Sequence, residues 1–198
     1  MPESGGRMTT SNGSEAKSCQ APNRIDLFRL SRARRAFRLA RHLELVQIKS
    51  PIALATADRR RFRLLRCSYL LMEEIPGATR LRAWKGDKRE AIRRLAALMA
   101  RLHEEGFAHR DLKESNFAFD AKGNPYLLDL DGLRYVQQLS DRRAAMNLAR
   151  LVESILAEAV QGDTVQITRS DRVRFLQHYC QERKRTDWRW WWHTIHFP

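Results

Sequence analysis

The sequence lacks any long uninterrupted run of apolar residues. A helix that spans a membrane needs about 18 of them, and the segment before residue 24 has no apolar stretch typical of a secretory signal. We therefore expect no membrane-spanning segment and a cytoplasmic location. Glycine and proline are also scarce, with 9 and 6 in 198 residues, which excludes collagen-like and low-complexity chains. The sequence predicts a folded chain of one domain or two small ones.

Cysteine is scarce as well, and its spacing carries no motif. Cys19, Cys67 and Cys180 lie far apart and form no C-x-x-C pair. This pattern excludes a disulfide framework and a zinc site, so we expect reduced, mostly buried thiols.

Acidic residues are outnumbered, mainly in the first third of the chain. The sequence holds 37 Lys and Arg against 23 Asp and Glu, a net charge of +14. Residues 1–66 hold 15 basic and 5 acidic side chains. Guanidinium groups bind phosphate and carboxylate well, so the partner is nucleic acid, an anionic membrane surface or a phosphorylated glycolipid; the alternative is a solvated helix face. The arginines form two groups: Arg32, Arg34, Arg35, Arg38 and Arg41, then Arg59, Arg60, Arg61, Arg63 and Arg66.

The N-terminal part of the chain predicts a tail, a helix and strands. Residues 1–23 are rich in Gly, Ser, Thr and Asn, which predicts a disordered tail. Ser31 is a candidate N-cap for a basic amphipathic helix that continues to about Leu45. Short apolar runs between Ile48 and Met72, separated by a charged turn at residues 57–60, predict two or three strands.

The rest of the chain predicts mainly helices. Asp87 and Glu90 match a capping box for a helix that ends near Glu105. Further helices are expected at residues 141–160 and 170–183. A C-terminal helix would place Trp188, Trp191 and Trp192 on one face with Ile195, and this face either packs on the protein or anchors it to a bilayer surface.

The most informative segment lies between these helices. Residues 109–116 read H-R-D-L-K-E-S-N, which matches the catalytic loop of the protein-kinase-like fold. Asp129, in the string L-L-D-L-D-G, follows Asn116 by 13 residues. That interval fits two short strands and a turn, which would bring Asp129 beside Asn116. Phosphoryl transfer needs a carboxylate at the acceptor hydroxyl and oxygen ligands for Mg²⁺. The alternative is that Asp111 and Asn116 cap a turn and Asp129 ends a strand.

Several segments together resemble one family. S-R-A-R-R-A-F at residues 31–37, S-Y-L-L-M-E at 68–73, I-P-G-A-T at 75–79, the block at 103–117 and L-L-D-L-D-G at 127–132 are similar to the bacterial lipopolysaccharide core kinases, which phosphorylate heptose or 3-deoxy-D-manno-octulosonic acid (Kdo). The resemblance covers about residues 30–180. It implies an α+β, protein-kinase-like two-lobed fold, with a reduced N-lobe and hinge at 24–77 and a mainly helical C-lobe at 78–198.

The resemblance also implies roles for particular residues. Asp111 takes the place of the catalytic base, with Lys113 near the γ-phosphate of ATP. Asn116 and Asp129 take the places of the Mg²⁺ ligands.

The resemblance further implies a nucleotide site in the N-lobe. Glu73 and Ile75 lie in the hinge segment against which adenine would sit. Lys17 is the candidate for the lysine that contacts the phosphates. A Gly-rich loop is missing, and the helix of residues 31–45 has only Glu44 as an acid, so the chain resembles a kinase with a shortened N-lobe.

The acceptor is expected to be small. Only nine residues separate Asp131 from the helix predicted to begin at Asp141, too few for the long segment on which protein kinases hold a peptide. We therefore expect ATP- and Mg²⁺-dependent phosphorylation of a sugar hydroxyl in lipopolysaccharide core, at the inner face of the cytoplasmic membrane, with no nucleic-acid partner. The alternative is a pseudokinase-like module that binds anionic glycolipid or nucleic acid without catalysis.

Overall fold

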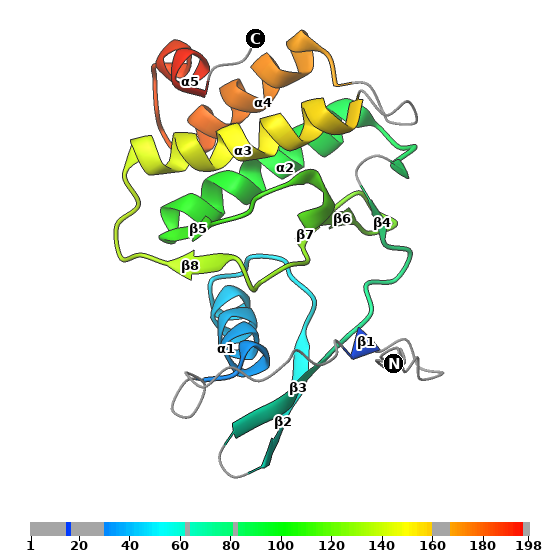
Figure 1. Ribbon diagram of the computed structural model, residues 1–198. Helices are drawn as coiled ribbons and strands as arrows, with labels where there is room; N and C mark the ends of the chain where they lie inside the picture. The colour runs from blue at the N-terminus through cyan, green and yellow to red at the C-terminus, as the bar shows by residue number, and fades with distance from the viewer. Residues whose placement is uncertain (1–14, 17–29, 62–63, 81–82, 160–166, 196–198) are drawn as a thin grey trace. The chain divides into compact units, whose positions relative to one another are not determined.

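The computed structural model describes residues 15–16, 30–61, 64–80, 83–159 and 167–195. The chain divides into two compact units, residues 1–75 and 76–198 (Figure 1). The first unit contains β1 (Glu15–Ala16), α1 (Arg32–Leu45), β2 (Ala53–Arg61) and β3 (Leu64–Met72). The second unit contains β4 (Thr79–Arg80), α2 (Lys88–Glu104), β5 (Phe107–His109), the 3₁₀ turn η3 (Glu114–Asn116), β6 (Phe117–Phe119), β7 (Pro125–Leu127), β8 (Leu133–Tyr135), α3 (Asp141–Ala159), α4 (Arg169–Glu182) and α5 (Trp188–Ile195).

In the described part of the first unit, an antiparallel sheet packs against the helix α1. β2 and β3 form a hairpin, and β1 pairs with the other edge of β3. The disorder predicted for residues 1–23 therefore does not extend to Glu15 and Ala16; the other residues of that tail lie outside the described ranges. α1 buries Ala33, Ala36, Ala40 and Leu43. Ser31 caps α1 as predicted, because its hydroxyl accepts the Arg34 N–H at 3.2 Å.

The charged turn predicted at residues 57–60 is wrong, because these residues lie inside β2. Asp58 pairs in register with Ser68 on β3. Its side chain is only 3% exposed and forms ion pairs with Arg34 on α1 at 3.1 Å and with Arg60 at 3.4 Å. A buried carboxylate needs such partners, and the partner on α1 is distant in the sequence.

The described residues of the second unit form four α-helices and two small sheets. β4, β6 and β7 form one antiparallel sheet, and β5 and β8 form the other. In Figure 1, α2 and α3 run side by side over these short strands, and α4 and α5 lie beyond them. The α+β class predicted from the sequence is therefore confirmed.

The helix α2 shows both a confirmed and a corrected detail. Asp87 is its N-cap, accepting the N–H groups of Arg89 and Glu90 at 2.8 and 3.3 Å. The predicted capping box does not form, because the Glu90 carboxylate accepts hydrogen bonds from Arg93 and Arg94 on the same helix. Because the Glu90 carboxylate is bound to these two arginines, it does not reach back to the backbone N–H of Asp87, as a capping box requires.

The C-terminal helix α5 packs its tryptophans unequally. Trp191 and Ile195 are buried, and the Trp191 ring contacts Tyr179 of α4 edge-on at 5.1 Å between centroids. Trp190 is 41% exposed. Trp191 therefore packs on the protein, as one of the two predicted alternatives has it. Trp188, Trp190 and Trp192 are less buried and remain the candidates for contact with another surface.

The two described cysteines differ. Cys180 on α4 is a buried free thiol, as predicted. Cys67 on β3 is disulfide-bonded, so the expectation of a reduced thiol there is wrong.

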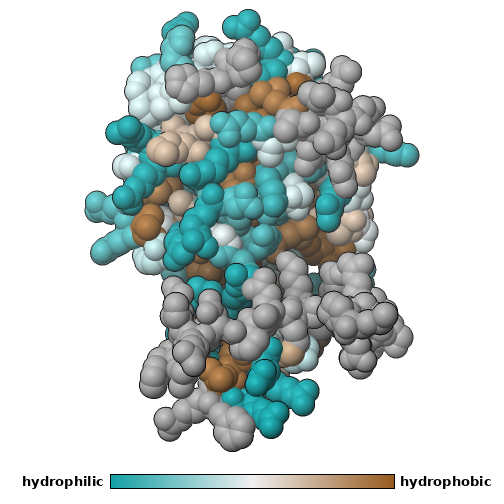
Figure 2. Space-filling view, viewed as in Figure 1, coloured by the Kyte–Doolittle hydropathy of each residue, from teal (hydrophilic) through white to brown (hydrophobic). Residues whose placement is uncertain are grey.

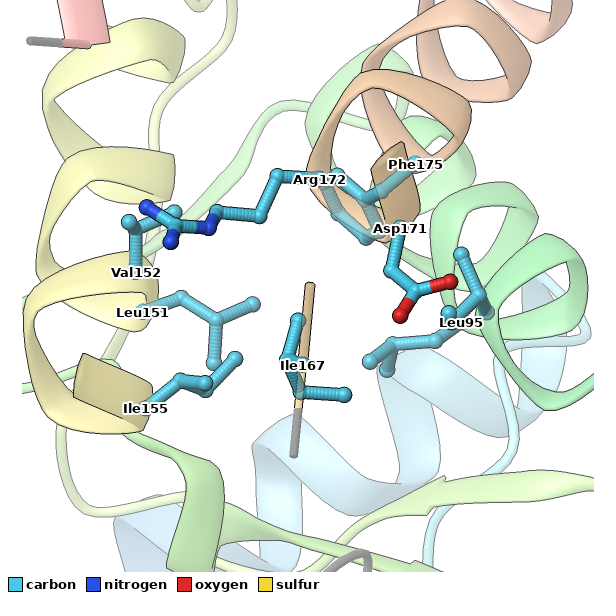
Figure 3. Close-up of a pocket in the computed structure, with 9 residues that line it drawn as sticks. Leu95, Leu151, Val152, Ile155, Ile167, Asp171, Arg172 and Phe175 are labelled. Carbon is cyan, nitrogen blue, oxygen red and sulfur yellow. The ribbon is translucent and has the colours of Figure 1, made fainter. Parts of the chain in front are cut away.

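A cavity lies among α2, α3 and α4 and is lined mainly by apolar side chains (Figure 3). Leu151, Val152 and Ile155 of α3 face Ile167 and Phe175 across it.

None of the helices in the described ranges is both long enough and apolar enough to cross a bilayer.

Candidate active site

The segment predicted to be a catalytic loop connects β5 to β6. β5 ends at His109 and pairs with β8, and Arg110 N–H donates to the Gly132 carbonyl at 2.9 Å. The loop then closes through η3, where Asn116 N–H donates to the Lys113 carbonyl at 3.0 Å. Both ends of the loop are therefore held by short sheets.

The β6–β7 hairpin brings Asp129 back beside Asn116, as the spacing predicted. Phe117 pairs with Leu127, and Leu128 N–H donates to the Asn116 carbonyl at 2.7 Å. Asn116 Nδ2 then lies 3.5 Å from Asp129 Oδ2. The two residues are buried and half-buried, respectively.

These two side chains offer oxygen atoms suited to a hard cation. Asp129 Oδ1 accepts the Asp131 N–H at 3.0 Å, and Asn116 Oδ1 accepts the Lys113 N–H at 2.7 Å. Each oxygen has a second lone pair. In the described ranges no three His, Cys, Asp or Glu side chains gather into a metal cluster. The Asp129 carboxylate fits Mg²⁺, which takes one or two protein oxygens and completes its shell with phosphate and water. Asn116 faces Asp129 with its Nδ2, so a turn of its amide would be needed to bring its oxygen to the same ion.

Asp111 and Lys113 form an ion pair in the middle of the loop. Lys113 Nζ lies 2.9 Å from Asp111 Oδ2, and the Asp111 side chain is 74% exposed. The hydrogen bond from Lys113 lowers the pKa of Asp111 below its usual range. The carboxylate is therefore ionised and accessible to a substrate.

His109 belongs to the scaffold of the loop, as predicted. It is buried, and its Nε2 donates to the Asp129 backbone carbonyl at 3.0 Å. Burial lowers the pKa of His109, so the ring is neutral near pH 7. A side chain at Gly132 would collide with this ring, so glycine in the D-G pair is required for the close approach of the two segments.

Asn147 on α3 contributes to the site but was not among the residues predicted from the sequence. Its Oδ1 accepts the His109 N–H at 3.1 Å, and its Nδ2 donates to the His109 carbonyl. Asn147 therefore holds both backbone groups of the residue that begins the loop. A polar residue within the buried stripe that contains Ala144, Leu148 and Leu151 is the signal that would have indicated it.

The residues proposed for nucleotide binding lie in the first unit. Ile75 is buried, and Glu73 is exposed with its backbone N–H donating to the Ile52 carbonyl at 2.9 Å. This N–H is thus already used within the sheet. Lys17 lies outside the described residues.

A loop that holds an ionised carboxylate and a lysine, closed by an amide beside a second aspartate, is the arrangement of kinase-like phosphotransferases. The chain belongs to the lipopolysaccharide kinase (Kdo/WaaP) family, whose model matches residues 23–179.

Two curated relatives come from one species. The chain is 32% identical over 144 residues to a 3-deoxy-D-manno-octulosonic acid kinase of Stenotrophomonas maltophilia strain R551-3 and 31% identical to that of strain K279a. Each match covers 68% of this chain and 57% of the relative. The chain thus spans little more than half the length of these relatives.

The chain is also similar to solved structures of WbdD at 18% sequence identity. One is a crystal structure and another a co-crystal structure with the kinase inhibitor LY294002. The matches cover 88% of this chain and 42% of WbdD, with TM-scores of 0.47 and 0.46.

Proposed function

We propose that this chain transfers the γ-phosphate of ATP, with Mg²⁺, to a sugar hydroxyl of lipopolysaccharide core. The observation that carries the proposal is the meeting of Asn116 with Asp129 at one end of the loop that presents the Asp111–Lys113 pair. Family membership supports the same reaction class. Between heptose and Kdo, we favour Kdo because both curated relatives are named as Kdo kinases.

In the proposed reaction, Asp111 orients the acceptor hydroxyl and accepts its proton. The acceptor oxygen forms a bond to the γ-phosphorus while the bond from phosphorus to the bridging oxygen of ADP breaks. A carboxylate of lowered pKa is a weak base, which suits a loose transition state in which positioning matters more than proton removal. Lys113 holds Asp111 and places positive charge beside the loop. Bound Mg²⁺, held by Asn116 and Asp129, would neutralise charge on the phosphates.

The short connection after the loop supports a small acceptor. Within the second unit, β8 ends at Tyr135 and α3 already begins at Asp141. A protein kinase would need a longer ordered segment here to hold an extended peptide. A sugar hydroxyl needs no such platform.

Nucleotide binding gives the direct test. A ligand that binds only the folded state at 100 times its Kd stabilises it by about 2.7 kcal/mol, which for a chain of this size corresponds to a rise in Tm of about 5–10 °C. We expect this rise with ATP and Mg²⁺, its loss on chelation, and labelled phosphate transfer to a Kdo-bearing core acceptor.

The alternative outcomes are distinct. Transfer only to a heptose-bearing acceptor would change the sugar assignment. No thermal shift at millimolar ATP would contradict the kinase proposal and favour a non-catalytic module that binds anionic glycolipid or nucleic acid.

We further propose that the first unit binds the anionic inner face of the cytoplasmic membrane. The side of α1 opposite its buried alanines carries Arg34, Arg38 and Arg41, all exposed. The β2–β3 hairpin adds further exposed arginines. Figure 2 shows teal, hydrophilic residues in this unit next to a brown, hydrophobic patch. Of these, Arg34 pairs with Asp58 and Arg41 with Glu44, so part of the basic charge is already balanced.

Vesicle sedimentation tests this surface. A basic residue near an anionic leaflet contributes about 1 kcal/mol, so the double charge reversal Arg35→Glu/Arg38→Glu should weaken binding to anionic vesicles at least about 30-fold. The matched control, Arg142→Glu/Arg143→Glu on α3, changes net charge equally and should bind like the wild-type chain. The proposed surface would be contradicted if both double variants lost binding to anionic vesicles equally. It would also be contradicted if the wild-type chain bound neutral and anionic vesicles equally.

A further inference from the structure

A row of buried hydrogen bonds connects α4 with the candidate catalytic loop. Arg183 Nη1 donates to the Tyr179 hydroxyl at 2.8 Å, and this hydroxyl lies 2.6 Å from His103 Nδ1. His103 Nε2 lies 3.1 Å from Asn147 Oδ1. Asn147 then holds the backbone of His109. Tyr179 and the three other side chains that lead to His109 are each at most 4% exposed.

The direction of donation along this row is set at both ends. A guanidinium group can only donate, so the Tyr179 oxygen accepts from Arg183. Asn147 Oδ1 accepts the His109 N–H and so presents an acceptor to His103 Nε2 as well, which leaves His103 Nδ1 to accept the single hydrogen of the Tyr179 hydroxyl. The ring proton of His103 must then be on Nε2, which donates to Asn147 Oδ1. Burial, with a smaller contribution from the charge of Arg183, lowers the pKa of His103 to about 3, so the ring is neutral.

The amide of Asn147 is held from both sides. Its Oδ1 receives two donors, His103 Nε2–H and the His109 N–H, while its Nδ2 donates to the His109 carbonyl. A flipped amide would place its NH₂ group against both donors and its oxygen against a carbonyl. Loss of a buried hydrogen-bond partner is costly, so one orientation is strongly favoured.

Arg183 is itself held firmly. Its Nε donates to Glu104 Oε1 at 2.6 Å, and its Nη2 lies 3.2 Å from Asp141 Oδ1. The guanidinium also lies over the rings of Tyr179 and Trp191, 5.5 Å from each centroid. The row therefore begins at a point fixed by α2, α3 and α5.

We propose that Tyr179 is a positioning residue of the catalytic loop, whose hydroxyl holds His103 in the tautomer that donates to the amide of Asn147, and this amide in turn holds His109. The effect of Tyr179 on phosphate transfer rests on the proposed function, whereas its effect on the order of the loop does not.

The test compares Tyr179→Phe with Phe175→Leu. Tyr179→Phe keeps the ring and removes only the hydroxyl. Phe175 stacks on Tyr179 with 6.3 Å between centroids but forms no hydrogen bond of the row, so Phe175→Leu controls for lost packing. We expect Tyr179→Phe to speed hydrogen exchange at the amides of residues 109–116 about tenfold and to lower kcat about tenfold, with KM for ATP unchanged. Phe175→Leu should lower Tm without either effect.

A second pair keeps the test decisive if Tyr179→Phe fails to fold. Glutamine offers one acceptor and one donor group, like neutral histidine, so His103→Gln should retain slow loop exchange, whereas His103→Leu should lose it. Loop exchange in Tyr179→Phe equal to that in wild type or in Phe175→Leu would overturn the proposal, as would equal behaviour of the two His103 variants. If the wild-type chain transfers no phosphate, the proposed function fails while the exchange rates still decide the role of Tyr179.

Discussion

Replacing Asp111 with alanine should slow phosphate transfer about 10²- to 10⁴-fold, the usual contribution of a positioned general base. Folding should be almost unaffected. The Asp111 side chain is 74% exposed and its ion pair with Lys113 lies at the surface; such pairs contribute at most about 1 kcal/mol, or about 2–4 °C in Tm for a chain of this size.

The assay is initial-rate transfer of labelled phosphate, with a thermal melt of each variant. Glu182→Ala on α4 removes another exposed acid and should keep the wild-type rate. If turnover is unchanged in Asp111→Ala, this residue is not the base, and the assignment of the loop fails.

Replacing Asp129 with alanine should abolish the Mg²⁺-dependent part of nucleotide binding. The expected result is loss of the rise in Tm of about 5–10 °C that saturating ATP and Mg²⁺ give the wild-type chain. Alanine also removes the acceptor of the Asp131 N–H. Asp129→Asn keeps an oxygen for that bond and removes only the negative charge, so it separates the metal role from the structural one.

Asp131→Asn is the matched control for this experiment. Asp131 is exposed, two residues from Asp129. The Asp131→Asn variant should retain the full nucleotide-dependent rise in Tm. If Asp131→Asn loses the rise and Asp129→Asn keeps it, the metal role moves to Asp131.

Local sequence signals predicted the helices well because their determinants lie within a few residues of each other. Ser31 and Asp87 are caps in the structure. The helix predicted from Asp141 also begins there. Caps and apolar stripes depend on residues within one or two helical turns, so they can be recognised from a short segment of the sequence.

Features that depend on distant partners were predicted poorly. The four residues from 57 to 60 look like a turn, yet they lie in β2, and the side chain of Asp58 is buried there because Arg34 on α1 balances its charge. Asn147 holds a backbone group 38 residues away in the sequence. The local pattern marks Asn147 as a polar residue in a buried stripe, but it does not identify the partner.

The candidate site lies between these two cases. The match of residues 109–116 to a kinase loop and the spacing to Asp129 indicated which side chains would meet, and Asn116 does lie beside Asp129. The interval of 13 residues between Asn116 and Asp129 has the length of the β6–β7 hairpin that joins them. The residues behind the loop, such as His103 and Tyr179, come from separate helices and needed the structure.

The buried row behind the loop keeps its own charges over a wide range of pH. The pKa of His103 lies at about 3, burial raises that of Tyr179 far above neutrality, and that of Arg183 is raised above an already high value; Asn147 does not titrate. Between about pH 4 and pH 10, none of these four side chains changes its charge. A pH–rate profile measured in that range would therefore contain no titration of these four side chains.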